Sequence, residues 1–156
     1  MRNETLHPIK QRKTLNDTFY TWFGDSKVVD ANGDPRVVYH GTRENITAFD
    51  PSKSRFSGGM YFSSSKEFAK RWAGPNGQVY AVYLRIENPL LDGFDGSGVG
   101  SHMSPSPWRD GGIFTKRQTD HYGEKGIKEY VVFSPSQIKS VDNNGTWDPL
   151  SDNIFK

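Results

Sequence analysis

The chain has 156 residues, of which 33% are hydrophobic, 13% aromatic and 24% charged, and its formal net charge is +2. This length suits one domain with a single core, and the many aromatic rings can fill that core although aliphatic residues are few. The small charge does not predict nucleic-acid binding, the lack of cysteine excludes disulfides and thiolate metal sites, and the chain has no apolar run of the roughly 18 residues that a membrane span needs.

Three parts can be distinguished along the chain. Residues 1–13 are polar and basic, so we expect a flexible basic arm there. Residues 14–150 are expected to form a single domain, and residues 151–156 a short tail. The four histidines lack the spacing of a metal site, so no metal is expected.

Two short helices are predicted. The i, i+3, i+4 spacing of Phe19, Trp22 and Phe23 predicts an amphipathic helix that Gly24 would end. A second helix is predicted over 66–73, because serines that can cap it come before and a Gly-Pro pair that can end it comes after.

Stretches rich in β-branched and aromatic residues predict strands over 26–30, 36–40, 78–86, 129–133 and 139–141, with a shorter one at 113–114. Asn32-Gly33 between the first two favours a β-hairpin. Both faces of the stretch 78–86 are apolar, so it is expected to be a central strand covered on both sides. Asn88-Pro89 is expected to close that strand.

Three separated stretches carry candidate site residues. The predicted apolar strand ends in His40-Gly41, which places a histidine at the end of the strand. The glycine indicates a turn or a close approach of the backbone. Each residue also has a structural explanation. A histidine at a strand end is more often structural than functional, Tyr61 beside Phe62 is typical of a core, and Glu129 could equally be a solvated residue at the start of a strand.

Taken together, the stretches resemble the signature of the His-Tyr-Glu class of ADP-ribosyltransferases, which contains diphtheria toxin and the poly(ADP-ribose) polymerases. The matching segments are His40-Gly41-Thr42-Arg43, Gly59-Met60-Tyr61-Phe62-Ser63 and Glu129-Tyr130-Val131-Val132-Phe133. Trp72 falls where the polymerases place a second ring against nicotinamide, and Ala69 replaces a serine that bonds the carboxamide there. Over roughly 19–150 the chain is more closely similar to the ADP-ribosyltransferase domain of phage polyvalent proteins and related bacterial effectors.

This resemblance implies an α+β ADP-ribosyltransferase fold, with two small, mostly antiparallel β-sheets around an NAD cleft and short helices on the flanks. It implies a mono-ADP-ribosyltransferase that cleaves the nicotinamide–ribose bond of NAD+, its co-substrate. The catalytic residues would be Glu129, His40 and Tyr61. A carboxylate such as Glu129 can bond the ribose 2′-OH and stabilise the oxocarbenium-like transition state, as carboxylates do in glycoside hydrolysis.

The resemblance also implies how NAD+ would be bound. Tyr61 and Trp72 would sandwich the nicotinamide ring, and the Gly41 backbone would meet its carboxamide. His40 would bond the adenosine ribose, with support from the hydroxyl of Thr42. For Arg43, a contact with pyrophosphate or adenine and a solvated loop position are equally open.

The acceptor would be a macromolecule, either protein or nucleic acid. In this class the loop before the catalytic strand faces the acceptor, and here that loop contains Arg117, Gln118, His121 and Tyr122, although a solvated loop is the default explanation for such residues.

Two other functions stay open. Water could be the acceptor, which would make the protein an NAD+ glycohydrolase toxin. Alternatively, the same fold could serve as a non-catalytic module that binds NAD+, ADP-ribose or RNA. With no signal peptide or membrane segment in the sequence, we expect a cytoplasmic monomer that does not bind membranes, a phage or bacterial effector or toxin that can be delivered into a host or target cell.

Overall fold

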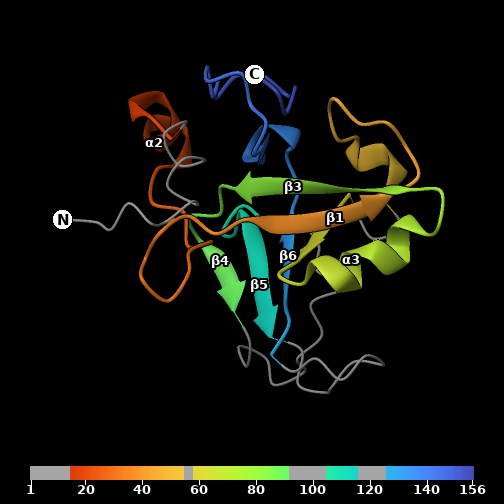
Figure 1. Ribbon diagram of the computed structural model, residues 1–156. Helices are drawn as coiled ribbons and strands as arrows, with labels where there is room; N and C mark the ends of the chain where they lie inside the picture. Colours follow the sequence, from red (N-terminus) through yellow and green to blue (C-terminus); the bar gives the residue numbers. More distant parts are fainter. Residues whose placement is uncertain (1–14, 55–57, 92–104, 116–125) are drawn as a thin grey trace.

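The computed structural model describes residues 15–54, 58–91, 105–115 and 126–156, which form one β-sheet with two α-helices (Figure 1). The strands are β1 (Val38–Thr42), β2 (Met60–Ser63), β3 (Gln78–Leu84), β4 (Pro89–Leu91), β5 (Gly111–Thr115), β6 (Lys128–Val132) and β7 (Ile138–Ser140). They lie in the order β4-β5-β6-β2-β1-β3-β7, and every neighbouring pair is antiparallel except β4 and β5. The basic arm proposed for residues 1–13 lies outside the described residues.

The two small sheets that were expected are two halves of one continuous sheet. β1 and β3 share a ladder of five residue pairs and β2 and β6 share four, but β1 and β2 are joined by the single pair Tyr39–Ser63. In Figure 1, β1 and β3 run across the direction of β4, β5 and β6. The sheet therefore changes direction at the junction of β1 and β2 but stays continuous. The predicted α+β class is confirmed.

Both predicted helices are confirmed, because their start and stop signals are local. Helix α2 (Asp17–Phe23) is capped by the side chain of Asn16, and α3 (Lys66–Ala73) by that of Ser65, whose hydroxyl oxygen accepts a hydrogen bond from Phe68 N at 3.0 Å. Gly24 and Gly74, both with positive φ, end them. Two short 3-10 helices, η1 (Pro51–Lys53) and η2 (Pro135–Gln137), have Asp50 and Ser134 as their N-cap residues.

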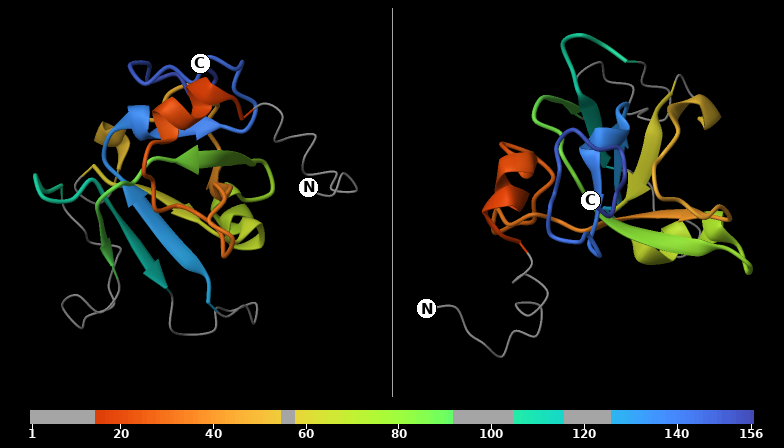
Figure 2. Two further views of the ribbon diagram at one scale, coloured as in Figure 1. Left: turned by 90° about the vertical axis from the view of Figure 1, so that its left-hand side faces the viewer. Right: turned by 90° about the horizontal axis from the view of Figure 1, so that it is seen from above.

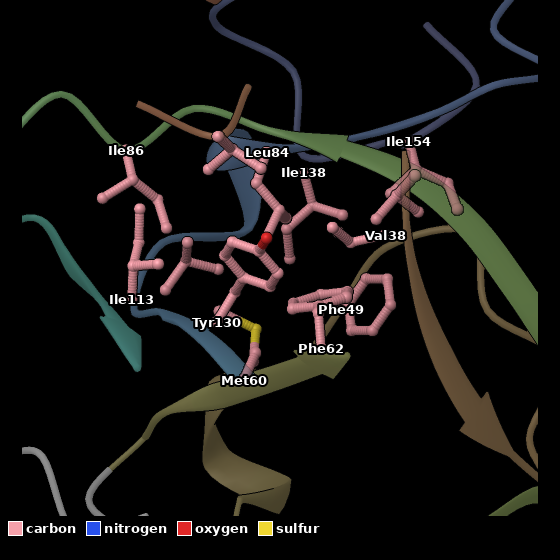
Figure 3. Packing of buried hydrophobic residues seen from close by; sticks show 13 residues of the cluster. Val38, Phe49, Met60, Phe62, Leu84, Ile86, Ile113, Tyr130, Ile138 and Ile154 are labelled. Atoms are coloured by element: carbon pink, nitrogen blue, oxygen red, sulfur yellow. The ribbon is translucent and has the colours of Figure 1, made fainter. Parts of the chain in front are cut away.

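The main core lies on one face of the sheet, between its two halves. Figure 3 shows the ring of Tyr130 in the middle of aliphatic side chains from β1, β3 and β7, with Met60 and Phe62 of β2 below it. On the other face of β3, Tyr83 packs with the aromatic side chains of α2 and with Trp147. β3 is thus covered on both faces, as its apolar pattern predicts.

The predicted hairpin is wrong in its first strand. Residues 26–30 form no strand, and a single isolated bridge joins Val29 to Pro35. Asp30 N and Arg36 N make the two hydrogen bonds that flank this bridge, but Lys27 N donates to the oxygen of Ile86 instead, so the ladder goes no further. The turn itself forms as expected. The carboxylate of Asp30 accepts bonds from Asn32 N and Asp34 N, and Gly33 adopts φ 82°.

The central strand β3 ends at Leu84, before Asn88-Pro89 as expected, and Pro89 begins a further strand, β4, at the edge of the sheet. A proline is tolerated at the first residue of an edge strand, because its missing N–H removes no ladder bond. β4 pairs in parallel with β5, which the residues alone did not indicate.

Within the described residues, no helix is long and apolar enough to cross a membrane.

The last residues of the chain are packed against the sheet. Trp147 and Ile154 are fully buried, and Figure 2 shows this C-terminal segment beside α2. The buried side chain of Lys139, on β7, holds the segment, because its Nζ donates to the carbonyls of Ser151, Asn153 and Lys156 at 2.9, 3.3 and 2.6 Å. Burial lowers the pKa of Lys139, and nearby carboxylates oppose that shift.

Lys139→Met is expected to lower the free energy of unfolding by about 2 kcal/mol, because three carbonyls would lose a charged donor in a buried place. Urea unfolding of the purified variant measures this loss. Lys70→Met is the matched control, because Lys70 lies on the exposed face of α3 in a surface ion pair with Glu67. Equal stability of the two variants would contradict a structural role for Lys139.

Candidate active site

A cleft of about 760 Å³ opens between α3, the diverging ends of β1 and β2, and the loop that runs from Arg43 to Ser54. Its volume falls within the roughly 300–1,000 Å³ that is usual for small-molecule and cofactor sites. The structure brings all seven residues of the predicted NAD site to this cleft: His40, Gly41, Thr42, Arg43, Tyr61, Trp72 and Glu129. The four predicted acceptor-loop residues, Arg117, Gln118, His121 and Tyr122, lie outside the described residues.

His40 stands where β1 and β2 separate. The ladder between the two strands does not extend past the pair Tyr39–Ser63. Beyond it, Nδ1 of the His40 imidazole lies 2.7 Å from the backbone oxygen of Tyr61. A carbonyl accepts, so Nδ1 carries the proton and Nε2 is left as an acceptor. The rings of Phe49 and Phe62 pack against the imidazole at centroid distances of 4.9 and 5.3 Å. The site therefore presents one oriented acceptor atom in apolar surroundings.

Burial among these rings lowers the pKa of His40 below its ordinary 6.5, and the bond to the Tyr61 carbonyl opposes this shift only in part. As pH falls below about 6.5, the unfolded chain therefore takes up a proton at this residue before the folded protein does. Stability should fall with pH through this window and level off below the folded-state pKa. Urea unfolding between about pH 7 and pH 5 measures the slope.

His40→Asn supplies the control for this prediction, because asparagine does not titrate and can still donate towards the Tyr61 carbonyl. The variant should lose part of the pH slope of the wild type. An unchanged slope would mean that the acid sensitivity arises from other groups.

Tyr61 and Glu129 share the face of the sheet opposite the main core. Ser63 pairs with Glu129 and Tyr61 pairs with Val131, so the tyrosine and the carboxylate are diagonal neighbours across β2 and β6. Burial, and secondarily the charge of Glu129, raises the pKa of Tyr61 to about 12. The phenol thus stays protonated at neutral pH beside a carboxylate, and it offers the cleft a neutral ring with a hydroxyl donor.

Gly41 is required by the packing of α3 on β1. An ideal Cβ at this position would collide with the backbone oxygen of Ala69 and lie 2.9 Å from the backbone nitrogen of Ala73. Both alanines are buried, at 2% and 3% exposure. Gly41 therefore allows a close approach of the backbone, as the sequence indicates. Among the described residues, the segment that comes close on the side of the missing Cβ is helix α3.

Trp72 projects from α3 at the mouth of the cleft and is 65% exposed. The ring of Phe68, one turn earlier, lies 6.5 Å from it, and the guanidinium of Arg71 lies 5.7 Å from the Phe68 ring. An exposed indole of this size beside a cleft can stack on a flat ligand. Tyr61 lines the same cleft from the sheet, so the two rings offer surfaces from two different elements.

Thr42 and Arg43 shape the turn that leaves β1. The hydroxyl oxygen of Thr42 accepts a bond from Glu44 N at 3.1 Å. The guanidinium of Arg43 lies beside the end of α3, where a Cβ on Gly74 would be 3.4 Å from its Nη2. A cation at a helix C-terminus is favoured by the exposed carbonyls. Arg43 is therefore positioned by α3 as well as by its place in the cleft.

Several contacts that sequence reasoning did not anticipate hold the loop wall in place. The Tyr80 hydroxyl accepts a bond from Ile46 N at 2.7 Å, and Gln78 donates to the backbone oxygen of Glu44 at 3.0 Å. Ile154 N donates to the oxygen of Thr47 at 2.8 Å. Tyr80 and Gln78 come from β3, next to β1. The hydroxyl of Tyr80 and the amide of Gln78, on an otherwise apolar strand, are the one sequence signal that could have indicated that these residues hold the loop. Ile154 had no such signal.

The chain matches a known protein family over its first five strands. The family model described as ADP-ribosyltransferase in polyvalent proteins matches residues 30–121, more than half of the chain. The match includes β1 to β5 with His40, Tyr61 and Trp72, but it ends before β6 and does not cover Glu129. No curated protein gives a significant match to the chain. Within the described residues, no group of three or more histidine or carboxylate side chains is arranged to hold a metal. This match over more than half of the chain shows that the chain belongs to the ADP-ribosyltransferases of polyvalent proteins.

Proposed function

We propose that this ADP-ribosyltransferase domain binds NAD+ in the cleft, cleaves its nicotinamide–ribose bond and transfers a single ADP-ribose to a macromolecular acceptor. The observation that carries the proposal is the convergence of residues from β1, β2, α3 and β6 on one cleft. Among them are an oriented imidazole, two aromatic rings and a carboxylate. Each could be structural by itself, but their meeting at one cleft supports a common ligand.

In the proposed reaction, the glycosidic bond to nicotinamide breaks and its electron pair leaves with the neutral nicotinamide. A new bond forms between the same ribose carbon and an oxygen or nitrogen of the acceptor, which loses its proton to the carboxylate of Glu129 or to water. Glu129 would also bond the ribose 2′-OH and stabilise the positive charge that develops on the sugar. The position of Glu129 as a diagonal neighbour of Tyr61 supports this role, because Tyr61 would contact the nicotinamide ring.

The rest of the cleft would hold the dinucleotide. Tyr61 and Trp72 would contact the two faces of the nicotinamide ring, a cation that favours aromatic surfaces. Nε2 of His40 would accept a hydrogen bond from a hydroxyl of the adenosine ribose, which agrees with the tautomer set by Tyr61. Alanine has no hydroxyl group, so at Ala69 the bond from serine to the carboxamide that other members of the class make would be missing.

The proposal is tested by incubating the protein with NAD+ labelled in its adenine ring and with a bacterial lysate. We expect free nicotinamide together with label in the protein or nucleic-acid fraction, and mass spectrometry should find single ADP-ribose units. Nicotinamide with free ADP-ribose and no labelled acceptor would instead identify a glycohydrolase. Binding of NAD+ without nicotinamide release would identify a non-catalytic module, and neither binding nor release by the folded protein would contradict the proposal.

We further propose that the protein acts as an effector on the proteins or nucleic acids of a bacterial cell. Expression of the wild type in a bacterium should then slow growth, while expression of Glu129→Gln at the same level should not. Equal growth of both cultures, at equal amounts of folded protein, would contradict this role.

A further inference from the structure

A surface ion pair joins the two ends of the loop wall of the cleft. Nζ of Lys53, at the end of η1, lies 2.7 Å from Oε1 of Glu44, two residues after β1. Both residues line the cleft. The loop has other anchors on β3 and on the C-terminal segment, among them the Tyr80 hydroxyl and Ile154 N, so its position does not depend on this ion pair.

The charged side chains that the structure describes in the cleft are negative on balance. Among the described residues, its lining contains three carboxylates, Glu44, Asp50 and Glu129, against the two cations Arg43 and Lys53. The diphosphate of a dinucleotide would add two negative charges. A charged hydrogen bond to a phosphate is favourable, so a cation of the cleft that turns towards the phosphates would strengthen binding.

The two cations differ in how firmly they are held. Arg43 lies beside the C-terminal end of α3, where the helix carbonyls favour a positive charge. Lys53 is paired with Glu44, and their side chains are 61% and 57% exposed. Ion pairs this exposed are weak, and lysine carries its charge on a flexible stem that can turn to a new partner. Lys53 is therefore the cation that can change partners at little cost.

We propose that Lys53 binds the diphosphate of the dinucleotide and that Glu44 occupies Lys53 in the free protein, so that ligand binding exchanges one ion pair for another. The inference rests on the proposed function, because it adds a specificity-determining residue to the same cleft. Glu44 then competes with the ligand. Removing its charge should strengthen binding, whereas removing Lys53 should weaken it.

The test is a double-mutant cycle measured by isothermal titration calorimetry with ADP-ribose, which keeps the diphosphate and cannot be consumed. Lys53→Met is expected to weaken binding about tenfold, as for loss of a charged hydrogen bond. Glu44→Gln is expected to tighten binding roughly threefold, because the lysine no longer has to be released. In the Lys53→Met background, Glu44→Gln should tighten binding less than it does in the wild type, because no ion pair is left to break and only the repulsion of the phosphates by Glu44 is removed.

Lys70→Met is the matched control, because Lys70 also pairs with a glutamate on the surface but is not among the residues that line the cleft. It should bind like the wild type. Thermal unfolding of each variant verifies the fold. Opposite signs for the two single variants exclude a purely structural role, since loss of a stabilising ion pair would weaken binding in both.

The outcomes separate this inference from the proposed function. A wild-type protein that binds neither ADP-ribose nor NAD+ contradicts the proposed function itself. If the wild type binds and Lys53→Met binds equally well, Lys53 does not contact the diphosphate. If Lys53→Met weakens binding but Glu44→Gln leaves it unchanged or weakens it, Glu44 does not compete with the ligand and the exchange is overturned.

Discussion

Replacing Glu129 by glutamine is expected to reduce both nicotinamide release and ADP-ribose transfer by at least about 100-fold. The variant keeps the size of the side chain and the β6 ladder with Ser63, but it removes the negative charge that would stabilise the developing cation on the ribose. NAD+ affinity should change by less than about threefold, because the lost interaction belongs to the transition state. Steady-state kinetics of nicotinamide release, combined with calorimetric binding of NAD+, measures both quantities.

Glu67→Gln is the control, because Glu67 lies exposed on the first turn of α3 and does not line the cleft. It should leave release and transfer unchanged. A second readout reports on the geometry. Glu129 contributes to the raised pKa of Tyr61, so the variant should lower that pKa from about 12. If turnover by Glu129→Gln equals that of the wild type, another residue carries the chemistry.

Gly41→Ala is expected to cost about 3 kcal/mol of stability, since a backbone oxygen of α3 lies where the new methyl group would go. The neighbour is part of a helix that is packed on the sheet, so it cannot move aside as a side chain could. Any relief would push α3, with Trp72, away from β1 and widen the cleft. Urea unfolding gives the loss of stability, and NAD+ binding by the fraction that stays folded should be weakened as well.

Gly33→Asn is the matched control for a glycine change. Gly33 has φ 82°, but an added Cβ would meet no atom within 4 Å, and asparagine tolerates this left-handed conformation. Its loss of stability should stay below about 1 kcal/mol. If Gly41→Ala were no more destabilising than Gly33→Asn, α3 would not lie as close to β1 as the structure has it.

Much of the local structure could be predicted because its signals lie close together in the chain. Ser65 before the second helix and Gly74-Pro75 after it define α3 without reference to the rest of the molecule. The alternation along 78–86 likewise predicts a strand with two apolar faces, and β3 is covered on both. The strand signals were less reliable at 26–30, which forms only the bridge from Val29 to Pro35, and at Pro89, which begins β4.

The arrangement of the sheet could not be read from the sequence. Whether the two halves separate depends on the single pair Tyr39–Ser63, which is a matter of tertiary register. The burial of Lys139 could not be predicted either, because a lysine on a short strand is expected to be exposed to solvent. It is buried because backbone carbonyls of residues 151–156 surround its Nζ. Contacts between distant parts of the chain decide both features.

The sequence predicted which residues line the candidate site, but it predicted less about how these residues are packed and positioned. The three motif segments share one cleft, but the sequence did not indicate that Gly41 packs under α3 or that Arg43 lies at the end of that helix. The pairing of Glu44 with Lys53 was also absent from the pattern, since both residues read as loop charges. The motif identified chemical groups, and the packing of α3 and the loop wall determines how these groups can be used.

The crystal structure of the Glu129→Gln variant with NAD+ bound is the most direct test of the central claim that this cleft is an NAD+ site. We expect the nicotinamide ring between Tyr61 and Trp72, its ribose beside residue 129, and the adenosine ribose within hydrogen-bond distance of Nε2 of His40. A dinucleotide bound outside the cleft, or in the cleft with its adenine at Tyr61 and its nicotinamide at His40, would contradict that claim.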